Sequence, residues 1–247
     1  RGARAEAKLA AEAPQAQSFT TVADAALPEA EEVVATVSAT DLAVEFRAPG
    51  KVDIPSDGTA HKTMLARHVL LPELDYLAAP RHTPAVFRRV KVSNTSAGPL
   101  LAGSVNLFAG DEFIGTSQLP YVPRDDQIEL MFGVEDRITI KRELIRRDVD
   151  KRLLRDRRQL GFGYEVEIEN LMAGPAAIEL MDQIPVALDE RIEVKFAGAK
   201  PPPDESSELN LLSWRLQLSS GEKWRLRYDF SVEHPRDLTL MGLAIET

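Results

Sequence analysis

The chain has 247 residues and a formal net charge of −9, so it is long enough to bury the core of one large β domain or two small ones. It contains no cysteine, which excludes disulfides, thiol nucleophiles and zinc–thiolate sites. The acidic balance disfavours nucleic acid as a partner, and no apolar run approaches the ~20 residues that span a bilayer. Because the sequence begins with Arg1 rather than methionine, we expect a fragment of a longer protein.

Residues 1–40 differ in composition from the rest of the chain. They are rich in Ala, Glu, Gln and Thr and are interrupted by Pro14 and Pro28. Residues 15–40 follow neither a helical nor a strand period, which is typical of a linker. Residues 4–12 are compatible with the end of a helix that continues from an upstream part. We therefore expect a non-regular or partly helical N-terminal segment.

From Asp41 the sequence changes to the period-two alternation of β-strands. Leu42, Val44 and Phe46 occupy every second position and form one apolar face. Further apolar runs predict strands over residues 74–77, 85–92, 128–132, 138–140, 164–169, 177–181, 192–196, 211–218 and 224–232.

Turn residues separate several of these strands. In residues 99–120, two apolar runs flank Gly110, which can adopt the positive φ of a tight hairpin. Residues 219–222 predict a second hairpin turn, and the three prolines at 201–203 predict an exposed loop. Residues 143–158 have apolar side chains at helical spacing, but we favour a long hairpin with a charged tip.

The number and spacing of the predicted strands define the fold class. Many short strands at roughly 8–12 residue spacing, with almost no amphipathic helix after residue 40, predict an all-β protein with antiparallel β-sandwich architecture. We expect two packed β-sandwich halves, residues 41–155 and residues 156–247. Whether the two halves are one domain is left open.

Residues that could carry chemistry are present but are not arranged in a known motif. The four histidines lack metal-ligand spacing, so we interpret them as surface or loop residues. The neighbouring acids are interpreted as turn residues, with a glycosidase pair or a calcium site as the alternatives. The histidines are His61, His68, His82 and His234, and the acid pairs are Asp111/Glu112, Asp125/Asp126, Glu135/Asp136 and Asp189/Glu190. We predict no catalytic, cofactor-binding or metal-binding residue.

A strongly basic segment lies at residues 141–158. It holds nine basic and four acidic residues in a chain that is acidic as a whole. One interpretation is a stripe that docks an acidic partner, with Arg146, Arg147 and Arg152 as the contact residues. The other is a solvated hairpin whose mixed charges prevent sheets from pairing edge to edge.

Three large aromatic residues fall in the last predicted hairpin. Trp214, Trp224 and Tyr228 could stack on a sugar if they were exposed, but large rings more often fill a sandwich core. We favour the core.

Several segments together resemble the DUF4139 family, which includes the mucoidy inhibitor A proteins. They are residues 52–62, 94–119, 132–136, 164–170, 182–186, 214–218 and 228–235. The resemblance implies an all-β C-terminal domain, preceded in the whole protein by another β domain and a coiled coil. Residues 1–40 are then the end of that coiled coil and a linker. The resemblance implies a bacterial protein at the cell envelope or periplasm. The family has no accepted catalytic residues that could be assigned to positions in this chain.

These observations favour a non-enzymatic structural or protein-interaction domain without a cofactor. Its partner is another protein, or a second copy joined through the upstream coiled coil, and not nucleic acid. The alternatives are a carbohydrate-binding module and a carboxylate-dependent hydrolase.

Overall fold

The computed structural model describes residues 36–40, 43–47, 51, 54–59, 61, 62, 64–150, 157–238 and 240. The chain forms two compact units, one of residues 1–36 and 46–67 and one of residues 37–45 and 68–247. In the first unit, the Asp57 carboxylate accepts a hydrogen bond from the Thr59 N–H at 2.9 Å and lies 2.9 Å from His61 Nε2, which closes a short turn. The second unit holds both large sheets.

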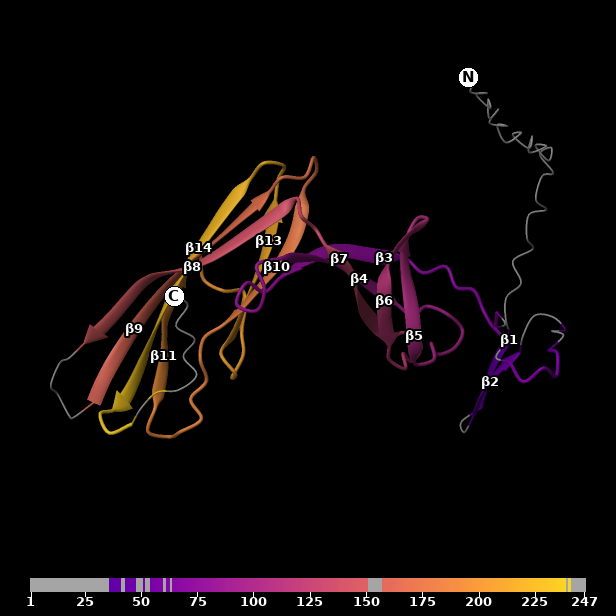
Figure 1. Cartoon of the computed structure of the whole chain (residues 1–247), viewed down its shortest axis with the longest axis horizontal. Coiled ribbons are helices and arrows are strands. Elements are labelled where there is room, and N and C mark those ends of the chain that lie inside the picture. The colour runs from indigo at the N-terminus through magenta and orange to yellow at the C-terminus, as the bar shows by residue number, and fades with distance from the viewer. Residues whose placement is uncertain are drawn as a thin grey trace, which may run out of the picture. The chain divides into compact units, whose positions relative to one another are not determined.

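Every regular element in the described ranges is a β-strand (Figure 1), which confirms the all-β prediction. The strands are β1 (Thr36–Thr40), β2 (Ala43–Arg47), β3 (Pro72–Ala78), β4 (Val86–Ser93), β5 (Gly103–Ala109), β6 (Glu112–Leu119), β7 (Gln127–Val134), β8 (Ile138–Asp150), β9 (Arg157–Asn170), β10 (Ala176–Gln183), β11 (Glu193–Lys200), β12 (Glu205–Ser206), β13 (Leu211–Leu218) and β14 (Lys223–Pro235). β1 occupies the end of the predicted linker, and residues 1–35, with the predicted helix, lie outside the described residues.

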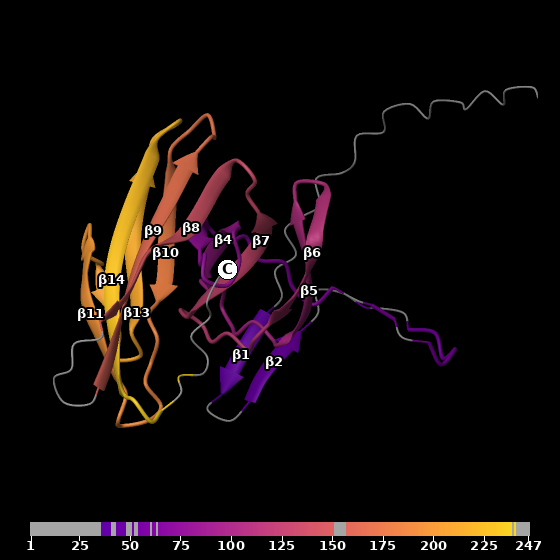
Figure 2. The same ribbon diagram turned by 60° about the vertical axis from the view of Figure 1, so that its left-hand side comes forward.

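The second unit contains two large sheets that share one core (Figure 2). One sheet has the strand order β12-β13-β10-β3-β4-β7 and the other the order β11-β14-β9-β8, while β5 and β6 form a separate hairpin. Neighbouring strands are antiparallel, as predicted, except for β3 and β10, which pair in parallel at residues 76–78 of β3. The β3–β10 and β8–β9 ladders cross the boundary predicted at residue 155. The division into two halves stays a prediction. In the structure, each of the two large sheets contains strands from both halves.

Local predictions of hairpins are confirmed where the structure describes them. Residues 143–150 and 157–158 belong to the paired strands β8 and β9 and not to a helix, and residues 151–156, where the charged tip was predicted, lie outside the described residues. Gly110 has a φ of 60° in the β5–β6 turn, and Gly221 has a φ of 73° between β13 and β14. The loop predicted from the three prolines, residues 201–207, contains the two-residue strand β12, whose side chains are exposed.

The core lies between the four-stranded sheet and β10, β13 and β3. Trp214 and Tyr228 are each only 1% exposed, and Trp224 is partly buried against the same cluster. The core interpretation of these rings is therefore confirmed, and an exposed stacking face made of Trp214 and Tyr228 is excluded. The rings of Tyr164 and Tyr228, on the paired strands β9 and β14, stack at a centroid distance of 5.5 Å.

One histidine prediction is wrong. His234 is not a surface or loop residue but lies on β14 with 5% exposure, and its Nδ1 is 2.8 Å from the carbonyl oxygen of Pro235. The reason is the alternation along β14, which turns His234 to the same buried face as Val232 and Phe230.

A buried asparagine forms the corner after β4. Asn94 is 1% exposed, and its Nδ2 donates to the carbonyl oxygens of Gly98, Val122 and Pro123 at 3.0 to 3.1 Å. Its Oδ1 accepts the N–H of Ser96 at 3.2 Å. One side chain thus ties the chain entering β5 to the chain leaving β6.

A second corner, after β9, has the same construction. Asn170 is fully buried, and its Nδ2 donates to the carbonyl oxygens of Gly174, Leu218 and Ser219 at 2.9 to 3.1 Å. Its Oδ1 accepts the N–H of Met172 at 3.0 Å. Both corners have the sequence Asn-x-x-Ala-Gly-Pro, at residues 94–99 and 170–175.

The strands around the two corners also keep the same register. Six residues beyond each asparagine a strand pair begins, at Leu100↔Val122 after the first corner and at Ala176↔Leu218 after the second. We therefore describe the second unit as containing an internal repeat, in which β4, β5, β6 and β7 of the first corner correspond to β9, β10, β13 and β14 of the second.

Replacing Asn170 with alanine is expected to lower the free energy of unfolding by about 2–4 kcal/mol, because several buried carbonyl groups lose their donor. Urea denaturation of the variant measures this loss. The exposed Asn106, whose only side-chain bond in the described region is to Thr116, is the matched control, and Asn106→Ala is expected to change stability little. Equal effects of the two substitutions would contradict the role given to the corner.

Candidate interaction site

The outer face of the six-stranded sheet carries a network of charged side chains around Arg89 of β4, here called the Arg89 network. Arg89 is only 4% exposed because carboxylates surround its guanidinium. Its Nε and Nη2 donate to the two carboxylate oxygens of Asp75, the residue opposite it on β3, at 2.8 and 2.6 Å. Nη2 also donates to Glu179 at 2.5 Å, and Nη1 lies 3.6 Å from Glu129. Lys91 completes the network with its Nζ 3.0 Å from Asp75.

Asp75 and Arg89 hold each other in their ionised forms. Burial alone would raise the pKa of Asp75, but hydrogen bonds from Arg89 and Lys91 outweigh it and lower that pKa. The hydrogen bond to Asp75 raises the pKa of Arg89, against the opposing effect of burial. Neither group therefore exchanges a proton near neutral pH.

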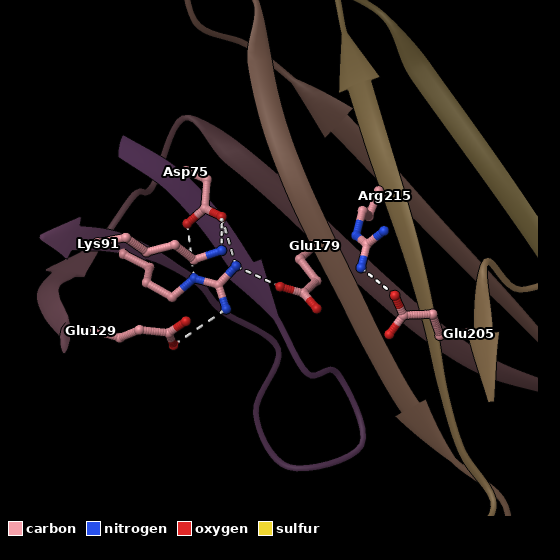
Figure 3. Close-up of polar contacts among 7 residues, drawn as sticks. Asp75, Lys91, Glu129, Glu179, Glu205 and Arg215 are labelled. Carbon is pink, nitrogen blue, oxygen red and sulfur yellow. Dashed lines mark hydrogen bonds and ion pairs between the residues drawn. The ribbon is translucent and has the colours of Figure 1, made fainter. Parts of the chain in front are cut away.

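A groove of about 180 Å³ lies beside the network, over β10. It is lined by Asp75, Lys91, Ala177, Ile178, Glu179, Arg215, Leu216 and Gln217. Figure 3 shows Asp75 and Lys91 on one side of β10 and Arg215 with its partner Glu205 on the other. Each charged lining residue has an oppositely charged partner, and the lining contains no aromatic ring on which a sugar could stack.

The outer face of the four-stranded sheet is also covered by paired charges. Across β14 and β9, Lys223 and Arg225 lie 3.0 and 2.7 Å from Glu169 and Glu167. These pairs are exposed and contribute little stability, but they leave few isolated charges on this face.

Two of the three predicted docking residues lie in the described part of the chain. Arg146 is exposed on β8, and its guanidinium lies 3.0 Å from Asp148 and 3.2 Å from Asp229. Arg147 is exposed on the same strand, and Arg152 lies outside the described residues. The docking role of Arg146, Arg147 and Arg152 stays a prediction, to which the structure adds that the charge of Arg146 is compensated.

Arg142, from the same basic segment, points inward instead. Its side chain is 8% exposed, and its Nε donates to the fully buried Asp182 at 2.9 Å. Its Nη2 donates to the hydroxyl of Tyr228 at 2.8 Å, and its guanidinium lies 3.8 Å above the ring of Tyr164. Tyr228 in turn donates to Asp182 at 2.7 Å. This cluster connects β8 and β14 of one sheet to β10 of the other.

The acid pairs lie in or next to turns, as predicted. Asp125 has a φ of 65°, and Asp189 accepts the N–H of Arg191 at 2.9 Å. Glu135 also lies at its predicted turn and accepts the N–H of Arg137 at 3.4 Å, but it is only 5% exposed and is bonded to the Arg137 side chain at 2.7 Å. Within the described ranges, no three histidine or acidic side chains are placed to hold a metal ion.

The carboxyl groups of the described residues whose pKa departs clearly from its ordinary value share one direction. All five pKa values are lowered, because hydrogen bonds to the ionised form outweigh desolvation. They belong to Asp57, Asp75, Glu135, Glu167 and Asp189, and the last falls to about 2 because of hydrogen bonds from Arg191. A carboxyl group that donates a proton near neutral pH needs the opposite shift.

The β5–β6 hairpin carries a pair of exposed aromatic rings. Phe108 and Phe113 face each other across the turn and are 54% and 55% exposed, with ring centroids 5.5 Å apart. Tyr121, beyond the other end of β6, is 56% exposed. The hairpin was predicted from its sequence but its exposed rings were not, although one phenylalanine on each side of the turn was a visible signal.

The fold and these surfaces define an all-β sandwich domain with paired surface charges and one aromatic hairpin. The chain belongs to the DUF4139 family, a domain of unknown function, whose sequence profile matches residues 5–236. The chain is 21% identical over 214 residues to "Protein F37C4.5" of Caenorhabditis elegans. That match covers 82% of this chain and 38% of the relative, so the chain spans less than half of the relative's length. Within the described ranges, no helical segment has the length and hydrophobicity to cross a bilayer.

Proposed function

We propose that this chain is a non-enzymatic protein-interaction domain. The observation that supports it best is the β5–β6 hairpin, where Phe108 and Phe113 lie side by side and remain half exposed. Exposed apolar groups gathered in one place are typical of a docking surface. Aromatic residues are also the ones that contribute most to protein interfaces.

The paired charges support the non-enzymatic part of the proposal. A hydrolase that uses two carboxyl groups needs one of them protonated at working pH. The acids beside the groove are instead bonded to Arg89 and Lys91, and the resolved carboxyl pKa values are lowered. Asp75, which lines the groove, is therefore held as a carboxylate and is unsuited to the role of proton donor.

The cellular setting of the proposal comes from the family resemblance. It includes a place at the cell envelope or periplasm and an upstream coiled coil that joins copies of the whole protein. The matched nematode protein means that relatives are not confined to bacteria.

A photo-crosslinking amino acid at Phe113 of the full-length protein, expressed in its native cells, tests the proposal. We expect crosslinking to one defined protein, which then binds the purified chain at least tenfold more weakly when Phe108 is replaced with serine. The matched control carries the crosslinker at Arg225, on the charged face of the other sheet. Equal crosslinking from both positions, or binding unaffected by Phe108→Ser, would contradict the proposal.

A further inference from the structure

The outer edge of β5 lacks a neighbouring strand. β5 pairs with β6, and no other strand of the described residues adds to that sheet. The seven residues of β5, Gly-Ser-Val-Asn-Leu-Phe-Ala, include no charge and no proline. Folded proteins usually protect such an edge with charged side chains, proline or a bulge, because its free N–H and C=O groups otherwise accept a further strand.

The edges of the four-stranded sheet are protected in these ways. β8 carries Lys141, Arg146 and Asp148, and its pairing is interrupted by a bulge between Leu144 and Arg146. β11 carries charged residues and a bulge between Phe196 and Gly198. β5 also has a bulge, between Leu107 and Phe108, but it has none of the charged side chains that β8 and β11 carry.

The internal repeat indicates what belongs at the edge of β5. β5 follows the Asn94 corner as β10 follows the Asn170 corner, with the same register toward β6 and β13. On its other side β10 pairs in parallel with β3, a strand from outside its own repeat. The corresponding edge of β5 has no neighbouring strand. By analogy with β10, we expect this edge to accept a parallel strand.

A candidate strand lies just before β3. Residues 68–71 belong to no strand of the structure and pair with none, yet Val69 and Leu71 are 82% and 88% exposed. Two large aliphatic side chains with this exposure, two residues apart, form the alternating face of a strand without a sheet. Residues 69–71 are uncharged, like β5.

We propose that two copies of this chain associate by adding residues 68–71 of one copy to the outer edge of β5 of the other. The proposal rests on the proposed interaction function and names its partner as a second copy. An unrelated partner at β5 would leave Val69 and Leu71 exposed. A second copy would pair with the free edge of β5 and cover these two side chains in the same contact. With two-fold symmetry the contact occurs twice and closes without further growth.

Sedimentation equilibrium of the chain tests the association. Val69→Asp with Leu71→Asp is expected to weaken the dimer at least tenfold, because it places charges on the added strand. Both residues are exposed, so the thermal unfolding temperature should not change when it is measured at a concentration at which both proteins are monomeric. Leu188→Asp is the matched control, since Leu188 is 100% exposed and lies outside the contact. A dimer unaffected by the double substitution would overturn the proposal.

The absence of cysteine allows the contact to be mapped. Chains carrying Ser104→Cys on β5 are mixed with chains carrying His68→Cys, and both positions are exposed. Oxidation is expected to give a mixed disulfide dimer, whereas Arg225→Cys in place of Ser104→Cys should give none. A chain that stays monomeric at all concentrations would refute this contact. The proposed function would still be tested independently, because crosslinking from Phe113 to a different protein does not require a dimer.

Discussion

Replacing Arg142 with methionine is expected to lower the free energy of unfolding by about 3–5 kcal/mol, the usual cost of removing one partner from a buried ion pair. The variant leaves the carboxylate of Asp182, which is fully buried, without its cation. It also removes the donor to Tyr228 and the cation above Tyr164. Urea denaturation at neutral pH measures the loss.

The matched control is Arg146, four residues further along β8. Its guanidinium is paired with Asp148 and Asp229, but the side chain is 53% exposed. Arg146→Met should therefore change stability little. If Arg142→Met cost no more than Arg146→Met, the buried cluster would not hold the two sheets together.

A second variant distinguishes the stability contributed by the charge of Arg142 from that contributed by the hydroxyl of Tyr228. Tyr228→Phe removes the hydrogen bond to Asp182 but keeps Arg142 beside that carboxylate. We expect a smaller loss than for Arg142→Met. Burial and the Asp182 carboxylate both raise the pKa of Tyr228, so its hydroxyl stays a donor throughout the pH range in which the protein folds.

The alternation of residues was sufficient to predict most of the fold. Strands β3, β4, β7 to β10, β13 and β14 fall where apolar residues recur at every second position, because one face of each is buried. The same rule could have placed Arg142, which shares the parity of Ile138 and Ile140 on β8. Grouping Arg142 with the basic segment obscured that signal, since local charge says nothing about the face a residue occupies.

Contacts between distant strands could not be predicted in this way. Arg89 faces away from the core, so its burial depends on Asp75 of β3 and Glu179 of β10, which come together only through the parallel pairing of these strands. No turn or period in the sequence specifies that pairing. The corner repeat, in contrast, was visible as Asn-x-x-Ala-Gly-Pro at residues 94–99 and 170–175, and an internal comparison would have found it.

The Arg89 network gives the second large effect. Arg89→Met is expected to lower the free energy of unfolding by about 3–5 kcal/mol at pH 7, because the partly buried Asp75 and Glu179 lose the cation that they share. Arg225→Met, which removes one exposed partner of Glu167, is the control and should have little effect. A loss no larger than that of the control would contradict the role of the network.

The pH dependence of the loss identifies its electrostatic origin. In the native chain the pKa of Asp75 is lowered from 3.8, so its contribution is present above pH 3.8 and is lost as the pH falls through the lowered value. In the Arg89→Met variant the same carboxyl group loses its main hydrogen-bond donor and is expected to have a raised pKa. Protonation of Asp75 at low pH therefore stabilises the variant, whereas it destabilises the native chain. The difference in unfolding free energy should therefore shrink between pH 7 and pH 3. A difference that stays constant over this range would assign the loss to packing of the arginine side chain instead of to its charge.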